Sequence, residues 1–147
     1  MSRFKRFLRG SRGANAVEFA LVAPLFFLLV FGMIDFGLIF SDWLVLTNGV
    51  REGARVGVVT EGNLTPKSAA VIAKVNDYTS VFGALDSGYP QVTCSDGTTC
   101  ESAESSLTVR AVRTRSLITP LGNFIAWFGG SMNNSIPLSS TSVMRNE

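Results

Sequence analysis

A long apolar run limits the fold of this 147-residue chain more than any other feature. It extends from Phe19 to Phe40, and Asp35 is its only charged residue. As a helix it would rise roughly 33 Å, at about 1.5 Å per residue, and the hydrocarbon core of a bilayer is about 30 Å thick. Because basic flanks stay cytoplasmic, we expect one span with the N-terminus in the cytoplasm and the C-terminus outside. Five basic residues and no acid precede the run: Arg3, Lys5, Arg6, Arg9 and Arg12.

Proteolytic processing is expected before the apolar run rather than after it. A secretory signal peptide has a shorter apolar region followed by a small-residue cleavage site, whereas this run continues into DFGLIFSDWLVLTN. Cleavage after Gly13, in the stretch GANAVEF, would remove the basic leader of residues 1–13 and make Ala14 the new N-terminus. The apolar helix would be retained. This arrangement is typical of a prepilin.

Three stretches resemble the TadE-like family of minor pilins, which are processed components of Flp-type, or Tad, pilus systems. They are GANAVEF from Gly13, APLFFLLVFGMIDFG, and VREGAR; the ending TSVMRNE also resembles the ending of these proteins. The resemblance therefore covers nearly the whole chain, although residues from about 60 to 105 are not distinctive. It implies a prepilin peptidase that cuts on the cytoplasmic side after Gly13, and a glutamate at the fifth mature position, which is Glu18.

Glu18 and Phe19 are the candidate processing and assembly residues. A carboxylate beside the hydrocarbon boundary is costly unless it is neutralised, paired or kept near headgroups. After cleavage the Ala14 ammonium and Glu18 would lie four residues apart on one helix face, so the acid can meet its own terminus or that of a neighbouring subunit. The simpler alternative is that Glu18 reaches interfacial water. Asp35, about 25 Å further along the helix, is expected near the outer headgroups rather than in a contact between subunits.

Charge and composition argue against a nucleic-acid-binding protein and against an enzyme. The net charge of +2 conceals an asymmetry, because the leader holds five of the thirteen basic residues and the processed chain would have eight bases and eleven acids, 8 − 11 = −3. The excess positive charge therefore lies in the leader, where it is expected to set the orientation of the span in the membrane. The chain has no histidine, no nucleophile motif and no phosphate-binding glycine loop. We expect no catalysis and no cofactor, with nucleotide use left to partner ATPases.

Cys94 and Cys100, the only cysteines, are separated by the turn-rich stretch SDGTT. In an extracytoplasmic, oxidising compartment such a pair is expected to form a disulfide. Closing this short loop would contribute roughly 2 to 2.5 kcal/mol by the loop-entropy relation. A metal site is not expected, because histidine and a second cysteine pair are lacking.

The helical pattern continues past the span. Apolar residues recur every three or four positions through SDWLVLTNGVREGARVGVV, which predicts one long stem. Gly49, Gly53 and Gly57 fall on one face, and each costs up to about 1 kcal/mol in helix propensity relative to alanine. Such a face allows close approach of another element. We expect that element to be the protein's own head rather than a neighbour's stem. Trp43 fits a membrane interface and packing against the head equally well.

The remaining residues predict a small α+β head. Thr65-Pro66 suggests an N-cap and first turn of a second helix that ends before Gly83. Alternation from Leu107 predicts a strand with one buried face, Gln91 to Cys94 a partner strand, and Ser139 to Met144 a last strand. Residues 117–128 suggest an irregular excursion or a short helix. The expected fold is α+β and pilin-like: a long N-terminal helix, membrane-spanning in its first half, with a head containing an antiparallel sheet.

The predicted organisation has three parts: a leader at 1–13, an N-terminal helix at 14–59 with its transmembrane part at about 19–40, and an extracytoplasmic head at 60–147. We expect a minor pilin in the bacterial inner membrane that takes part in assembling or priming a Tad-type pilus. Its expected partners are the prepilin peptidase, other major and minor pilins, platform proteins of the pilus machine and the bilayer. Whether it initiates, caps or adheres stays open. The alternative is a single-span anchored binding or sensor domain, which would keep Met1 and its basic flank.

Overall fold

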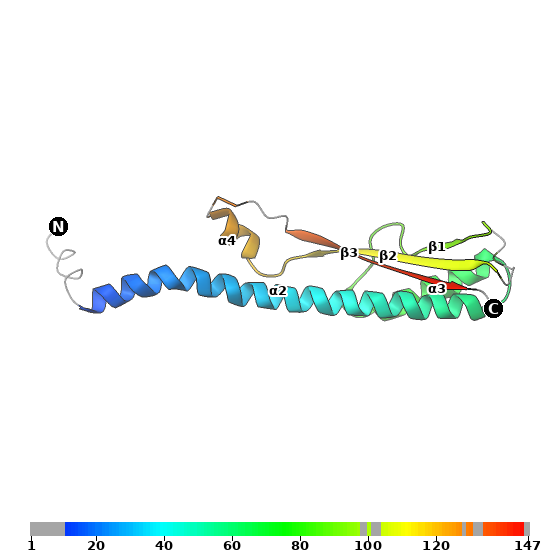
Figure 1. The fold of residues 1–147 in the computed structure, drawn as a ribbon, viewed down its shortest axis with the longest axis horizontal. Helices are drawn as coiled ribbons and strands as arrows, with labels where there is room; N and C mark the ends of the chain where they lie inside the picture. Colours follow the sequence, from blue (N-terminus) through cyan, green and yellow to red (C-terminus); the bar gives the residue numbers. More distant parts are fainter. Residues whose placement is uncertain (1–10, 98–99, 101–103, 128, 131–133, 146–147) are drawn as a thin grey trace. The chain divides into compact units, whose positions relative to one another are not determined.

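The structure is a computed structural model that describes residues 11–97, 100, 104–127, 129–130 and 134–145. Its elements, in chain order, are α2 (Ser11–Val59), α3 (Leu64–Thr79), η1 (Ser80–Phe82), β1 (Gln91–Cys94), β2 (Ser106–Ser116), α4 (Leu121–Trp127) and β3 (Ser135–Arg145) (Figure 1). They form two compact units. The first unit comprises Met1–Phe36 and Leu117–Met132, and the second comprises Gly37–Ser116 and Asn133–Glu147.

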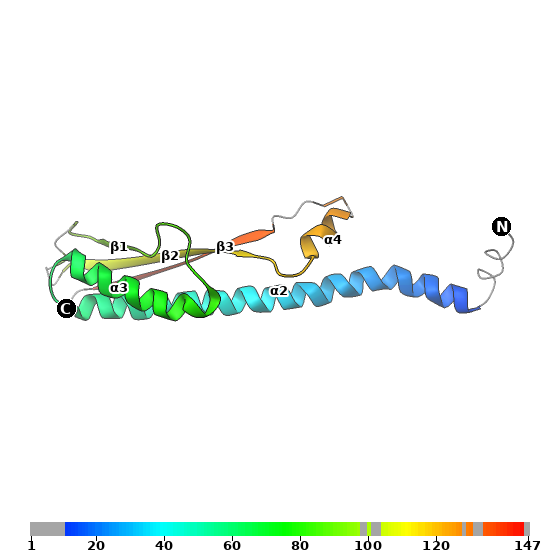
Figure 2. The same ribbon diagram turned by 180° about the vertical axis from the view of Figure 1, so that it is seen from behind.

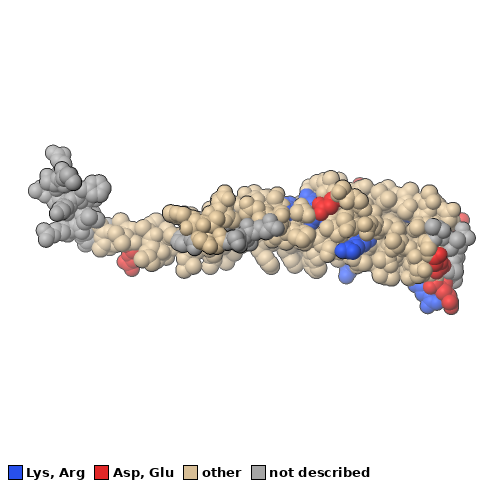
Figure 3. Space-filling view, turned by 90° about the horizontal axis from the view of Figure 1, so that it is seen from above, with Lys and Arg blue, Asp and Glu red and all other residues tan. Residues whose placement is uncertain are grey.

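The long helix α2 contains 49 residues and continues through Pro24. This confirms the expectation of a long N-terminal helix. Within the described residues it is the one helix long and apolar enough to cross a membrane, and none of its most apolar window is buried inside the structure. The face of α2 seen in Figure 3 is almost free of charged side chains over its N-terminal half. Its first half therefore has the length and surface of a single-pass anchor.

The second unit is built on a three-stranded antiparallel sheet in the order β1-β2-β3. The predicted strand Gln91–Cys94 is confirmed as β1, which pairs with β2 from Gln91↔Arg110 to Cys94↔Leu107. β3 begins four positions before the predicted Ser139, because β2 continues to Ser116 and pairs along its whole length. Pro137 lies within β3 and is tolerated there, because β3 is an edge strand, where a residue without an N–H can be accommodated. The α+β fold with an antiparallel sheet is thus confirmed.

The core of the second unit lies between the sheet, α3 and the C-terminal part of α2. In Figures 1 and 2 the sheet lies along one side of α3 and of this part of α2. Alternate residues of β2 point inward, as the sequence predicts, and they are at most 1% exposed. The fully or almost fully buried apolar side chains are Leu46, Val50, Ala54, Val71, Val75, Leu107, Val109 and Ala111.

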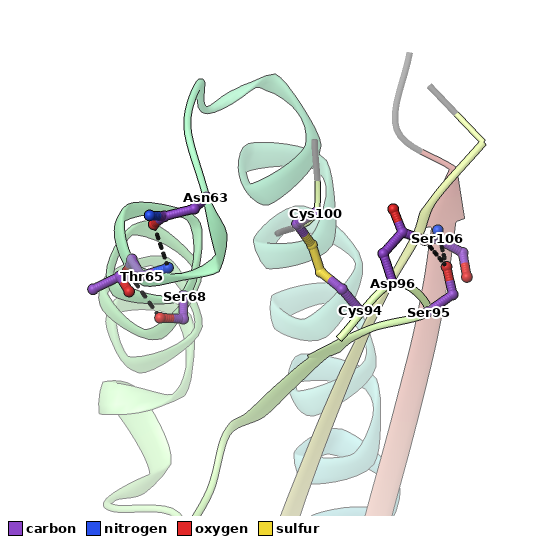
Figure 4. Close-up of a disulfide and its surroundings, with 8 residues drawn as sticks. All are labelled: Asn63, Thr65, Ser68, Cys94, Ser95, Asp96, Cys100 and Ser106. Atoms are coloured by element: carbon purple, nitrogen blue, oxygen red, sulfur yellow. Dashed lines mark hydrogen bonds between the residues drawn. A yellow bond between two sulfur atoms is a disulfide. The ribbon is translucent and has the colours of Figure 1, made fainter. Parts of the chain in front are cut away.

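The N-terminus of α3 differs from the prediction. Asn63, not Thr65, is the N-cap: its side-chain Oδ1 accepts a hydrogen bond from the Thr65 N–H at 3.1 Å (Figure 4). Gly62, at φ +101°, turns the chain so that Asn63 takes the extended conformation of a cap. Pro66 then falls in the first turn, where its missing N–H has no helical partner to lose. The helix ends in η1 before Gly83, as predicted.

Candidate processing and assembly segment

The bond between Gly13 and Ala14 lies in the first turn of α2, which begins at Ser11. N–H groups in a first turn have no acceptor within the helix, and glycine lowers helix propensity by about 1 kcal/mol relative to alanine. Unwinding the chain around Gly13 is therefore inexpensive. The leader residues Arg3, Lys5, Arg6 and Arg9 lie outside the described residues.

Glu18 and Phe19 lie on α2 just after this turn, and both side chains are exposed. Ala14 and Glu18 are one helical turn apart, about 6 Å along the axis, so cleavage after Gly13 would place the new ammonium and the carboxylate on one face. The apolar residues around them are uncovered. Val17 is 61% exposed and Phe19 is 70% exposed. This surface can be covered only by lipid or by another protein.

The three glycines of the stem face α3 and β2 of the same chain. A Cβ atom on Gly53 would come within 2.5 Å of Val75 Cγ2, and one on Gly57 within 2.6 Å of Val71 Cγ2. At Gly49 the approach is less tight, with an added Cβ 3.0 Å from Tyr78 Cβ near the end of α3. The valine side chains are fully buried and cannot move aside. In this structure the glycine face is occupied by the head of its own chain.

Asp42 forms a buried ion pair with Arg115 inside the second unit. Arg115 Nη1 donates to Asp42 Oδ2 at 2.7 Å, and the side chains are 15% and 1% exposed, respectively. Asp42 Oδ1 and the hydroxyl of Thr47 are buried without a hydrogen-bond partner among the described residues. Sequence reasoning missed this pair. The available signal was a second acid seven positions after Asp35, which is two helical turns and hence the same face.

Asp35 has partners within its own chain that the sequence did not predict. It is only 4% exposed and lies against the loop before α4, inside the first unit. Its expected position near the outer headgroups stays a prediction. Its Oδ1 accepts from the N–H groups of Ile118, at 3.2 Å, and of Thr119, at 3.3 Å. Its Oδ2 accepts from the Thr119 hydroxyl. The carboxylate is buried because the chain returns to α2 after β2, a long-range contact that local sequence does not reveal.

Two further features stabilise the second unit. Cys94 and Cys100 form the predicted disulfide, with their Cα atoms 5.7 Å apart (Figure 4). Asp86 accepts from the Thr114 N–H at 2.9 Å and from the Thr114 hydroxyl at 2.7 Å. These two hydrogen bonds, with a smaller contribution from the charge of Arg113, hold the pKa of Asp86 below its ordinary value of 3.8. Trp43 is 42% exposed, with its ring centroid 6.0 Å from that of Phe40, so both interpretations of it stay open.

Neither a catalytic constellation nor a metal centre emerges from these contacts. Within the described ranges, no group of three or more His, Cys, Asp or Glu side chains is placed to hold a metal ion. The arrangement supplies apolar surface, one exposed acid near the glycine of the predicted cleavage site, and two buried acids that hold distant segments against α2.

A long uncovered apolar helix followed by a small antiparallel sheet defines an α+β protein with one candidate membrane anchor. Residues 13–55 match the model of the family described as TadE-like protein. The resemblance found in the sequence is thereby confirmed from Gly13 to Arg55, and the match supports a TadE-like protein of Tad pilus systems. The rest of the chain, including the TSVMRNE ending, lies outside it. Neither a curated protein nor a solved structure matches the chain.

Proposed function

We propose that this chain is a minor pilin that a prepilin peptidase cleaves after Gly13 and that enters or primes a Tad-type pilus through its N-terminal helix. The observation that carries the proposal is the TadE-like match at residues 13–55 on a helix whose most apolar window is not buried anywhere in the described structure. The protein contributes packing rather than catalysis. The leader, residues 1–13, would stay on the cytoplasmic side, and the head, residues 60–147, would belong to the extracytoplasmic side.

Cleavage would change the chemistry of the helix terminus. It removes the five basic residues of the leader and leaves an ammonium at Ala14, one turn from the exposed Glu18. In lipid or inside a helix bundle, an unpaired carboxylate is costly, and its attraction to an ammonium is stronger than in water. Glu18 therefore gains most when it faces the terminus of a neighbouring processed pilin. This pairing would set the axial position at which two stems pack.

The glycine face indicates that the two halves of α2 make different contacts. Gly49, Gly53 and Gly57 are covered by the chain's own head, so that part of the stem is unavailable to a neighbour. Between Val17 and Phe36 most of the large apolar side chains are exposed, although Asp35 is covered by the loop before α4. Stem-to-stem contacts with other pilins, and contacts with the membrane platform of the pilus machine, are therefore assigned to this first half.

The processing step is tested by substitutions at two glycines of the N-terminal region. Gly13→Leu places a bulky side chain at the proposed cleavage position, whereas Gly10→Leu changes a glycine three residues upstream. In cells that carry the matching peptidase, the intact mass of the wild type and of the Gly10→Leu variant should correspond to a chain beginning at Ala14. The Gly13→Leu variant should keep Met1. Cleavage of the Gly13→Leu variant at the same bond would exclude this assignment.

The assembly step is tested at Glu18. Glu18→Ala should leave cleavage intact but reduce the recovery of co-purified pilins by about tenfold, equivalent to about 1.4 kcal/mol of lost pairing. Glu61→Ala is the matched control, because it removes an exposed acid outside α2. Equal recovery for both variants would show that Glu18 merely reaches interfacial water. A wild-type chain that keeps Met1 would instead favour an anchored binding or sensor domain.

A further inference from the structure

A long uncharged segment follows β2. No Asp, Glu, Lys or Arg occurs between Arg115 and Arg145. The part of this segment that belongs to the first unit contains α4, Leu121–Trp127, and the loop before it. In Figures 1 and 2 α4 lies alongside the blue, N-terminal part of α2. The first unit therefore places a second uncharged segment beside the candidate membrane span.

The loop before α4 has no unsatisfied backbone donor from residue 118 to residue 120. The N–H groups of Ile118 and Thr119 both donate to Asp35, and Pro120 has no N–H to satisfy. The Thr119 hydroxyl donates to the same carboxylate. Non-helical backbone is tolerated at membrane depth only where its polar groups find partners within the protein. Asp35 supplies those partners from α2.

At the C-terminal end of α4, backbone hydrogen bonds within the segment satisfy polar groups. The Gly129 N–H donates to the Ala126 carbonyl at 3.0 Å, and the Gly130 N–H donates to the Ile125 carbonyl at 3.1 Å. Gly129 has a φ of +82°, the left-handed conformation that ends many helices. Two of the carbonyls that a helix end would otherwise leave to water are thereby satisfied.

Large apolar side chains on this segment point outward. Ile118 is 65% exposed and Trp127 is 80% exposed, and on the neighbouring α2 Leu25 is 69% exposed. In water such exposed apolar surface would be unfavourable by about 25 cal/mol per Å². Tryptophan is enriched at the boundary between headgroups and hydrocarbon, and isoleucine is favourable in the hydrocarbon itself. The surface offers no ion pair or charged side chain that would fix the register of a protein partner.

We propose that the segment Leu117–Trp127 is a second lipid contact of this chain, lying at the headgroup–hydrocarbon boundary beside α2 and held there by Asp35. The inference rests on the proposed membrane anchorage of α2. The occupant is lipid rather than a neighbouring stem, because the segment belongs to the same unit as the span, is joined to it at Asp35, carries no charge and has its loop backbone satisfied internally. The chain would therefore enter the bilayer twice, once through α2 and once through this short excursion.

Tryptophan fluorescence of the full chain in proteoliposomes tests the proposal. The chain has two tryptophans, so Trp43→Phe leaves Trp127 as the only one. Lipids brominated near the top of the acyl chain should quench Trp127, and the aqueous quencher acrylamide should have little effect. A span reporter, Phe26→Trp in a chain with Trp43→Phe and Trp127→Phe, should be quenched by lipids brominated deeper in the chain.

The two reporters distinguish failure of the second lipid contact from failure of the membrane anchor. If the span reporter is quenched by brominated lipid but Trp127 is quenched only by acrylamide, the second contact is excluded and the anchor stands. Shielding of Trp127 from both quenchers would also exclude it, because another protein surface would then cover α4. Failure of both reporters to respond to lipid would exclude the anchor itself. Asp35→Ala tests whether the hydrogen bonds to Asp35 hold the segment in place. This variant should lose lipid quenching at Trp127, and unchanged quenching would contradict the role of Asp35.

Discussion

The buried pair of Asp42 and Arg115 gives an asymmetric prediction for its two alanine variants. Arg115→Ala would leave a carboxylate that is 1% exposed and has one oxygen already without a partner. Breaking a buried pair in this way costs about 3–5 kcal/mol. Asp42→Ala would leave a guanidinium that is 15% exposed and can turn toward water, so the cost should be nearer about 1–3 kcal/mol. Replacing both residues, as Asp42→Leu with Arg115→Met, should recover most of the lost stability.

Hydrogen exchange of the full chain in detergent micelles measures these differences. The amides to follow are those of Val109 and Ala111, which lie in the central strand and are fully buried. Arg115→Ala should accelerate their exchange by about 10² to 4 × 10³-fold, and Asp42→Ala by clearly less. Equal acceleration by the two single variants would refute the desolvation argument. A double variant no more protected than Arg115→Ala would refute it as well.

Three further outcomes follow from other contacts. Gly53→Ala should destabilise the second unit by about 1–2 kcal/mol, because overpacking against buried side chains outweighs the gain in helix propensity. Gly37→Ala is the control: an added Cβ there has nothing within 4 Å, so this variant should not be destabilised. Hydrogen exchange at the same amides measures both. Replacing Cys94 and Cys100 by alanine should lower the free energy of unfolding by about 2 kcal/mol, since the bridge closes a loop of sequence separation 6; an unchanged denaturation midpoint would contradict this. The lowered pKa of Asp86 contributes stability that is fully present above the ordinary aspartate pKa and is lost as the pH falls through the folded-state pKa. The difference in stability between the wild type and an Asp86→Asn variant should therefore shrink as the pH falls below 3.8, and a difference that stays constant would contradict this.

Local patterns sufficed to predict the elements of this fold. The apolar run and its continuation predicted α2, because helix formation depends on neighbours three and four positions away. Alternation from Leu107 to Ala111 predicted the buried face of β2, and the structure confirms it. The cysteine spacing predicted the disulfide. The helix cap was placed two positions late, because Asn63 and Thr65 are both good caps and only the turn at Gly62 decides between them.

The contacts that hold distant segments against α2 could not be predicted in this way. Asp42 meets Arg115 across 73 positions, and Asp35 meets Thr119 across 84. Each acid, taken alone, was compatible with headgroups, water or a neighbouring subunit. The partners of both acids come from the end of β2 and the loop that follows it. Where these residues lie depends on the pairing of the whole sheet, which local sequence does not reveal.

The central claim is that the basic leader is lost while the apolar helix stays in the bilayer. Its most direct test is the intact mass of the protein recovered from membranes washed with alkaline carbonate, from cells with and without the prepilin peptidase. We predict a membrane-embedded chain beginning at Ala14 when the peptidase is present and at Met1 when it is absent. A protein that keeps Met1 in both cells, or that is released by the wash, would contradict the account.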